Sequence, residues 1–227
     1  MKDFISESFK EALKDYLFLK NKEYPDKAAG KLVGDRYRLT GVQRMVLFRG
    51  VTSTAKALIR QGKLTGDSAG KKLYVDGYNV LFTIMNYLTG KAVFIGNDGL
   101  LRDAGAGYGE IEKETFFYKA VDLFFQWLGN CAAESVTIYL DRSVTNNALH
   151  RKVMESQIQA LTIDGEVNLV PLADRELKGK RDGLIATSDS QIIDAAPGKI
   201  IDAARHTLES KYGDRIEILD LRHTASP

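Results

Sequence analysis

Residues 72–80 of this chain read Lys-Leu-Tyr-Val-Asp-Gly-Tyr-Asn-Val, and this stretch restricts the possible folds more than any other. The apolar run ends at Asp76-Gly77 and is followed at once by a helical pattern. That order is typical of a buried strand that leads into a helix. The strand therefore brings the Asp76 carboxylate to its own carboxyl end, which is the edge where open α/β sheets bind ligands.

The rest of the chain after residue 80 continues as alternating strands and helices. Residues 135–141 and 183–189 are further apolar runs that end on an Asp, and residues 114–129 have strong helical periodicity. A β-hairpin is expected around the Asn97-Asp98-Gly99 turn, and a strand, a helix and a strand within residues 199–221. Such alternation predicts right-handed crossovers and a mainly parallel, Rossmann-like α/β sheet that is covered on both faces.

The N-terminal residues 5–62 predict a small helical module instead. Residues 5–21 form the first expected helix, with Ser8 and Glu11 as a capping box, and Thr40-Gly41-Val42-Gln43 has the same form. Residues 62–72 are rich in Gly, Ser and Lys and lack apolar periodicity, which favours a linker. We therefore expect two domains: a helical module over residues 1–66, basic in its second half, and an α/β domain over residues 70–227.

Composition excludes several classes of protein. The hydrophobic content of 44% is enough for a core. The single Cys131 excludes an internal disulfide, and the three scattered histidines match no zinc-ligand spacing. No stretch approaches the ~20 apolar residues of a membrane span, and the N-terminus lacks the apolar core of a signal peptide. We therefore expect a soluble cytoplasmic protein.

Charge is distributed unevenly along the chain. Residues 31–72 contain ten Lys and Arg but only two Asp, a net charge of +8, whereas residues 73–227 carry −6. This layout favours a module that binds a polyanion beside an acidic site, with Arg36, Arg49 and Lys72 as candidate phosphate contacts. The alternatives are a solvated basic surface that binds nothing, or pairing of Arg36 and Arg49 with acidic residues of the chain.

Asp76, Asp141 and Asp189 end three predicted parallel strands and should share one edge of the sheet. Unshielded carboxylates ~4 Å apart repel by about 4 kcal/mol per pair at an effective dielectric of ~20. A cation makes such a cluster tolerable, and oxygen ligands without His or Cys select Mg²⁺ or Mn²⁺ over zinc. The alternative interpretation is that each Asp caps the helix that follows it.

Polar neighbours of these Asp residues are further candidates. Asn79 follows Asp76 by three residues and could direct its amide at a ligand or a carboxylate. Ser188 and Ser190 flank Asp189 and offer hydroxyl groups that orient a carboxylate or donate to phosphate. Their simpler role is helix capping. Asp182 begins the strand that ends near Asp189, so it should lie at the opposite end of the sheet.

Short motifs carry a resemblance to a known family. LYVDGYNV, IYLDRS and GLIATSDSQIID resemble the acidic motifs of PIN-like and NYN-type nucleases, a Rossmann-like family of metal-dependent ribonucleases. The layout of nearly the whole chain, including KLVGDRYRLTGVQRMVLFRGV, resembles the uncharacterised bacterial and archaeal DUF434 proteins with a PIN-like C-terminal part. By this resemblance Asp76, Asp141 and Asp189 take the metal-binding and catalytic positions, and Asn79 matches the Asn of the NYN pattern.

The resemblance also implies a fourth acidic residue, on a helix between the first and the later Asp positions. Asp103, Glu110, Glu112 and Glu114 compete for this role. Glu114 is equally explained as an acidic residue at a helix N-terminus, where the helix dipole favours it. Asp103 and Glu110 flank the Gly-rich residues 104–109, which we interpret as a loop near the site.

The sequence thus predicts a metal-dependent ribonuclease, with single-stranded or structured RNA as substrate and Mg²⁺ or Mn²⁺ as cofactor. One alternative is a non-catalytic RNA- or nucleotide-binding protein that kept the fold but not the metal site. Another is that residues 1–70 form a docking or dimerisation module, which leaves a homo-oligomer open.

Overall fold

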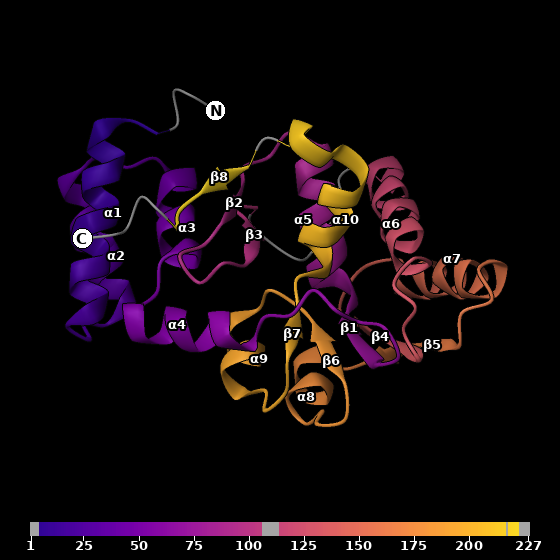
Figure 1. The fold of residues 1–227 in the computed structure, drawn as a ribbon. Helices are drawn as coiled ribbons and strands as arrows, with labels where there is room; N and C mark the ends of the chain where they lie inside the picture. Colours follow the sequence, from indigo (N-terminus) through magenta and orange to yellow (C-terminus); the bar gives the residue numbers. More distant parts are fainter. Residues whose placement is uncertain (1–4, 106–113, 217, 223–227) are drawn as a thin grey trace. The chain divides into compact units, whose positions relative to one another are not determined.

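The computed structural model describes residues 5–105, 114–216 and 218–222. The chain divides into two compact units, both built from separate stretches of sequence (Figure 1). The first unit comprises residues 1–62, 90–105 and 217–227, and the second comprises residues 63–89 and 106–216. The first boundary falls near the predicted linker, but the two later segments of the first unit lie within the stretch that the sequence assigned to the α/β domain.

The first unit begins with the helices that apolar periodicity predicts. They are α1 (Glu7–Asn21), α2 (Asp26–Arg36), α3 (Gly41–Gly50) and α4 (Thr54–Lys63). The Thr40–Gln43 capping box is confirmed, because both of its hydrogen bonds form. The box predicted at Ser8 and Glu11 is wrong, since α1 starts earlier and the Ser6 side chain accepts from the Phe9 amide.

A three-stranded sheet completes the first unit. Strands β2 (Val93–Ile95) and β3 (Leu101–Asp103) form the predicted hairpin, and β8 (Leu219–Asp220) pairs in parallel with β2, giving the order β3-β2-β8. Phe94, Leu219 and Leu221 belong to the same buried apolar cluster as residues of α1, α2 and α3. The hairpin and the C-terminal strand join this unit because they cover the apolar faces of its helices.

A buried ion-pair network fixes the hairpin within the first unit. Asp98 is 1% exposed and accepts hydrogen bonds from Arg60 at 2.9 Å and from both terminal nitrogens of Arg102 at 2.7 Å. Burial raises the pKa of Asp98, but attraction and hydrogen bonds from Arg102 and Arg60 outweigh burial and hold it below its ordinary value. The network joins α4 to the hairpin across 38 residues of sequence.

The second unit contains a five-stranded, entirely parallel sheet in the order β5-β4-β1-β6-β7. Its strands are β1 (Lys72–Asp76), β4 (Ser135–Asp141), β5 (Gly165–Val170), β6 (Leu184–Ala186) and β7 (Ile200–Ile201). The predicted Rossmann-like α/β class is confirmed. The strand order reverses at β1, so the topological switch point lies between β1 and β6.

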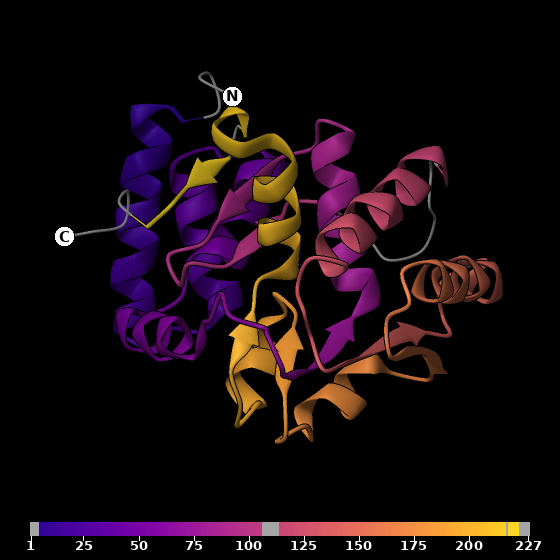
Figure 2. The same ribbon diagram turned by 45° about the vertical axis from the view of Figure 1, so that its right-hand side comes forward.

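Helices flank this sheet. They are α5 (Gly77–Leu88), α6 (Glu114–Leu128), α7 (Asn147–Ala160), α8 (Ala173–Lys178), α9 (Ser190–Ala195) and α10 (Ala203–Tyr212), followed by a 3₁₀ turn at Gly213–Arg215. Helices α5, α6 and α10 pack side by side (Figures 1 and 2), α7 packs on β4 and β5, and α8 packs on β1 and β4. Helix α9 follows Asp189, where the sequence places a helix only under the capping interpretation. Within the described residues, none of the helices has the length and apolarity that a bilayer span requires.

The Asp98 network gives a stability prediction. Asp98→Ala leaves two guanidinium groups buried without their carboxylate, so the free energy of unfolding should fall by about 3–5 kcal/mol. Urea denaturation measures this change. Lys31→Ala is the matched control, since Lys31 forms an exposed ion pair with Asp35 and should cost below ~1 kcal/mol. Similar losses in both variants would contradict a structural role for the network.

Candidate active site at the carboxyl edge of the parallel sheet

Asp76 stands at the carboxyl end of the central strand β1 and is 5% exposed. It occupies the N-cap position of α5, yet its side chain makes no capping hydrogen bond within the described chain. A Cβ atom on Gly77 would lie 2.5 Å from Leu140 and 3.0 Å from the Tyr139 carbonyl oxygen. The Asp-Gly pair therefore lets α5 begin tightly against β4 and keeps Asp76 at the strand end.

The loop after β6 is tied to Asp76 across the switch point. The Thr187 hydroxyl donates to Oδ2 of Asp76 at 2.8 Å, and Oδ1 of Asn79 accepts from the Ser188 amide at 2.8 Å and from its hydroxyl at 3.1 Å. The side-chain amide oxygen of Asn79 thus orients the loop. Ser188 is buried within this arrangement, whereas Ser190, the first residue of α9, is half-buried.

A second group of carboxylates lies at the ends of β4 and β5. Asp141 ends β4, and its Oδ1 accepts from the Ala173 amide at the start of α8 at 2.8 Å. The next residue, Asp174, is an acidic neighbour that the sequence analysis missed. Its carboxylate also accepts from Lys178 at 3.1 Å. The signal was present, because residues 167–174 are another apolar run that ends on an Asp, delayed by Pro171-Leu172.

The pKa values of Asp76 and Asp141 are both raised by burial and by neighbouring carboxylates. Burial raises the pKa of Asp76 to about 8; the Thr187 hydrogen bond opposes that shift, and the charges of Asp189, Asp141 and Asp174 add to it. Burial also raises the pKa of Asp141, partly offset by the Ala173 amide and reinforced by Asp174. The charges of Asp141, Asp174 and Asp189, which end or follow β4, β5 and β6, thus all act on Asp76, and we call these four residues the acidic cluster.

The capping interpretation holds for Asp189, whose Oδ1 accepts from the Gln191 amide at 2.6 Å and the Ile192 amide at 3.4 Å, capping α9. Asp202 does the same for α10 after β7. Neither Asp76 nor Asp141 caps the helix that follows its own strand. Capping therefore explains part of the cluster and leaves Asp76, its most buried member, without that explanation.

Two of the competing candidates for a fourth ligand, Asp103 and Glu114, have other partners. Asp103 belongs to the first unit, where Arg49 lies 3.5 Å from its carboxylate and donates to its backbone carbonyl at 3.0 Å. Glu114 accepts from Asn146 at 2.7 Å, and its charge acts on Tyr118 and His150. Glu110 and Glu112 lie outside the described residues. Glu114 is not among the charges that act on Asp76 or Asp141, whereas Asp174 acts on both.

Most of the basic residues in segment 31–72 already have polar partners within the protein. Lys63 donates to the carbonyl oxygens of Ile193 and Ala196. Seven of its other basic residues form ion pairs with carboxylates, namely Lys31, Arg36, Arg44, Arg49, Arg60, Lys71 and Lys72. Four of these carboxylates, Asp15, Asp98, Asp103 and Asp182, lie outside residues 31–72 and offset half of the segment's net charge of +8.

Lys72 lies at the amino end of β1, at the opposite end of the strand from Asp76, and pairs with Asp182 at 2.8 Å. Asp182 also accepts from the Tyr74 hydroxyl at 2.9 Å. The expectation that Asp182 lies away from Asp189 therefore agrees with the structure. The candidate phosphate contact Lys72 is not brought to the carboxylate cluster.

The cluster is not a preformed metal cage. Within the described residues, no group of three or more His, Cys, Asp or Glu side chains is close enough together to hold a metal ion. Mg²⁺ commonly keeps several waters and binds through one or two carboxylates plus substrate phosphates. The acidic residues suit binding through one or two carboxylates and several waters better than direct coordination by three or four protein ligands.

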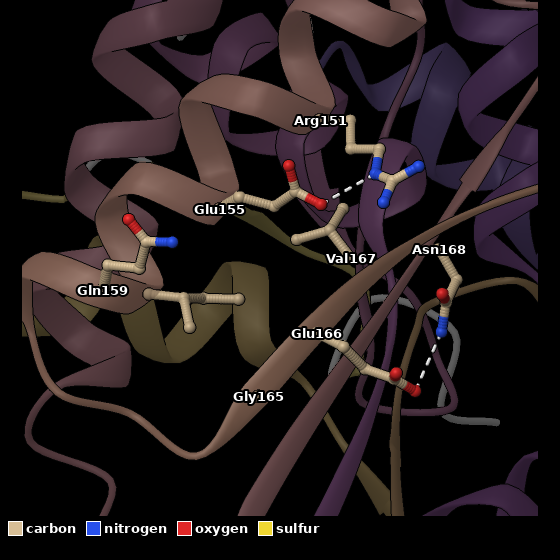
Figure 3. A pocket seen from close by; sticks show the side chains of 8 residues that line it. Arg151, Glu155, Gln159, Gly165, Glu166, Val167 and Asn168 are labelled. Atoms are coloured by element: carbon tan, nitrogen blue, oxygen red, sulfur yellow. Dashed lines mark hydrogen bonds and ion pairs between the residues drawn. The ribbon is translucent and has the colours of Figure 1, made fainter.

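A cavity of about 270 Å³ lies on the outer strand β5, between this strand and α7 (Figure 3). Its charged side chains are already paired, Arg151 with Glu155 at 2.8 Å and Glu166 with Asn168 at 2.9 Å. None of the clustered carboxylates lines it. This cavity is therefore separate from the candidate active site.

Comparisons with known proteins give two family matches. Residues 65–206 match the family described as "Domain of unknown function (DUF5616)", and residues 8–63 match "Protein of unknown function (DUF434)". The expected resemblance to DUF434 proteins is confirmed for the N-terminal segment. Neither match is to a PIN-like or NYN-type family, so that resemblance stays a prediction.

Uncharacterized protein MJ0935 of Methanocaldococcus jannaschii is 30% identical to the chain over 205 residues, which cover 89% of this chain and 97% of that protein. The similarity thus extends across both matched segments. No solved structure matches the chain significantly.

The pKa of Asp76 gives a prediction for stability against pH. The folded pKa of about 8 lies above the ordinary value near 3.9, so the folded state holds a proton that the unfolded state releases as pH rises between them. Stability is fully present below about pH 4 and declines toward pH 8. Asp76→Asn removes this decline, and without metal it should exceed the wild type in free energy of unfolding by on the order of a few kcal/mol at pH 8.

Urea denaturation at pH 5 and pH 8 in the presence of EDTA measures this difference. The advantage of Asp76→Asn should be smaller at pH 5 than at pH 8. Asp182→Asn, at the opposite end of the sheet, is the matched control and should show no such gain with pH. An Asp76→Asn difference that is the same at both pH values would contradict a buried, protonated Asp76.

Proposed function

The chain belongs to the DUF5616 family, and from the arrangement of its carboxylates we propose that the second unit is a divalent-metal-dependent ribonuclease that hydrolyses RNA phosphodiester bonds. The observation that carries this proposal is the burial of Asp76 among Asp141, Asp174 and Asp189 at the switch point of a parallel sheet. A ligand-binding role for this edge follows from the general behaviour of open α/β sheets.

Stability alone gives no reason to gather these carboxylates. Burial and three neighbouring negative charges all oppose ionisation of Asp76. Perturbed pKa values of this kind concentrate at functional sites, because the opposing charge is supplied there by a ligand. A divalent cation at the cluster would reverse the repulsion and restore the ionised form of Asp76.

The donor set favours a hard cation. The cluster offers carboxylate oxygens, with the Thr187 hydroxyl and the Asn79 amide nearby, and such ligands suit Mg²⁺ or Mn²⁺. Asp76 and Asp141 are the residues that would hold the ion, with Asp174 and Asp189 acting directly or through water. When bound, such an ion activates a water molecule and stabilises the charge of the phosphodiester in the transition state.

The other residues position these ligands. Thr187 fixes the rotamer of Asp76 through its hydroxyl, and the Ala173 amide fixes that of Asp141. Asn79 holds the loop that carries Asp189, so its effect on catalysis is indirect. Ser190, half-buried at the start of α9, is the hydroxyl group of this loop that we assign to substrate phosphate.

The choice of RNA as substrate rests on the nuclease-like motifs and on the chemistry of the edge, not on the basic segment, because most of its cations are already paired with carboxylates. Arg36 is the most exposed of the proposed phosphate contacts, with a 70% exposed side chain, whereas Arg49 is half-buried against Asp103. Any contribution of the first unit to RNA binding therefore depends on exposed cations such as Arg36.

A non-catalytic RNA- or nucleotide-binding protein is the second candidate. It is favoured by the lack of a preformed three-ligand group among the described residues. Such a protein would keep the edge geometry and bind RNA in a salt-sensitive way without taking up a divalent cation at Asp76. Cation binding therefore separates the two candidates.

The nuclease proposal is tested with purified protein, Mn²⁺ and a mixture of RNAs. The wild type should cleave, and Asp76→Asn should lose activity by more than the ~10- to 100-fold that follows loss of a residue which only orients a ligand. Asp174→Asn should also lose activity, because Asp174 belongs to the cluster. Asp182→Asn is the matched control and should retain activity. Equal cleavage by the wild type and Asp76→Asn, or none by either, would overturn the proposal.

Calorimetry tests cation binding without relying on activity. Mn²⁺ should bind to the wild type at pH 7 with release of about one proton, because Asp76 carries a proton below its pKa of about 8 and ligands must be deprotonated. The proton is detected as a heat that changes between buffers of different ionisation enthalpy. Asp76→Asn should bind more weakly and release no proton. Absence of Mn²⁺ binding together with salt-sensitive RNA affinity would support the binding protein instead.

A further inference from the structure

A second cavity, of about 210 Å³, lies in the second unit away from the carboxylates. Its wall comes from the segment that precedes β1, from the end of α6 with the residues just after it, and from α10. The lining residues are Gly66, Asp67, Ser68, Ala69, Trp127, Asn130, Cys131 and His206. The first two parts of the wall lead into the amino ends of β1 and β4, whereas Asp76 and Asp141 stand at their carboxyl ends.

Two aromatic rings dominate this wall. The planes of Trp127 and His206 are parallel within 5°, with ring centroids 6.3 Å apart, and both side chains are half-buried. Parallel rings beside an open cavity offer π-faces to a third planar group. Stacking of a nucleobase on an aromatic side chain is worth roughly 1–3 kcal/mol and is tolerant of sequence.

The polar groups of the cavity are mainly acceptors. The Asp67 carboxylate is held in place by the Ala69 amide at 3.1 Å and by Lys71 at 2.9 Å, and its side chain is 70% exposed. Asn130 uses its NH₂ group on the Gln126 carbonyl at 2.8 Å, which turns its oxygen toward other donors. These acceptors suit the amino and imino N–H groups on the edge of a base.

Size narrows the class of ligand further. The cavity is smaller than the roughly 300–1,000 Å³ of pockets that enclose a drug-sized molecule. The cavity therefore suits one nucleobase, and the sugar and phosphate of a nucleotide would remain outside it. The two-ring indole of Trp127 offers the larger stacking surface to a two-ring base.

We propose that this cavity binds the purine base of a nucleotide, stacked against Trp127 and His206. The base belongs either to a free nucleotide or to an RNA strand, and the chemistry of recognition is the same for both. Binding at this cavity does not require the carboxylate cluster or its cation, so the proposal stands whether or not the second unit is a ribonuclease.

Trp127 is the only tryptophan of the chain, so its fluorescence reports on this cavity alone. Titration of the full-length protein with AMP and GMP in EDTA should give saturable quenching, and UMP should bind more weakly because it stacks over a smaller area. His206→Ala should weaken purine binding at least about fivefold, the loss of roughly one stacking contact. No quenching by either purine nucleotide, or equal quenching in the wild type and His206→Ala, would overturn the proposal.

A cavity-filling variant provides a second test that leaves both rings in place. A Cβ atom on Gly66 would lie 3.6 Å from the His206 ring, which is ordinary van der Waals contact, so Gly66→Leu should fold and fill the cavity. It should abolish quenching by purine nucleotides. Gly62→Leu is the matched control, because a Cβ atom there meets nothing within 4 Å. Unchanged quenching in Gly66→Leu would overturn the proposal.

Alkylation of Cys131 by N-ethylmaleimide provides a third test of the proposal. Cys131 is the only cysteine and lines the same cavity, so AMP should slow its alkylation by N-ethylmaleimide, and equal rates with and without saturating AMP would overturn the proposal.

Comparison of AMP with a short oligoadenylate in EDTA identifies the source of the base. Tighter binding of the oligoadenylate that Gly66→Leu abolishes assigns the cavity to an RNA strand, and equal binding assigns it to a free nucleotide.

Discussion

The hydrogen bond from the Thr187 hydroxyl to Asp76 is the contact on which the carboxyl edge of the sheet depends. It joins the ends of β1 and β6, the two strands that meet at the switch point. One hydroxyl group cannot compensate for the burial of an ionised carboxylate, and the pKa of Asp76 stays raised to about 8. At neutral pH Asp76 is therefore mostly protonated, and a positive charge beside it would favour the ionised form.

Different numbers of hydrogen bonds hold the two halves of the acidic cluster in place. On the β6 side, Asn79 and Thr187 connect the loop to β1 through several hydrogen bonds, although β1 and β6 pair over only three residues. On the β4 side, the long pairing of β4 with β5 ends at Asp141, which is fixed by one amide at the start of the six-residue helix α8. Movement of α8 would change the position of Asp174 most directly and leave Asp76 in place.

The sequence predicts most of this architecture because its signals are local. Apolar runs that end on Asp identify β1, β4 and β6, and the capping box of Thr40 identifies the start of α3. The predictions fail where the partner is distant in sequence. The strand β8 looks like part of the parallel sheet until it pairs with β2, and the contact of Arg49 with Asp103 across 54 residues has no local signal either. Asp174 was missed because Pro171-Leu172 separates it from β5.

Protons and cations compete for the same oxygen atoms in this cluster. Each carboxylate that approaches Asp76 makes its proton harder to remove, and the same carboxylate makes a divalent cation more strongly attracted. Because a carboxyl group must lose its proton before it binds a cation, cation binding at this edge becomes easier as pH rises toward the Asp76 pKa of about 8.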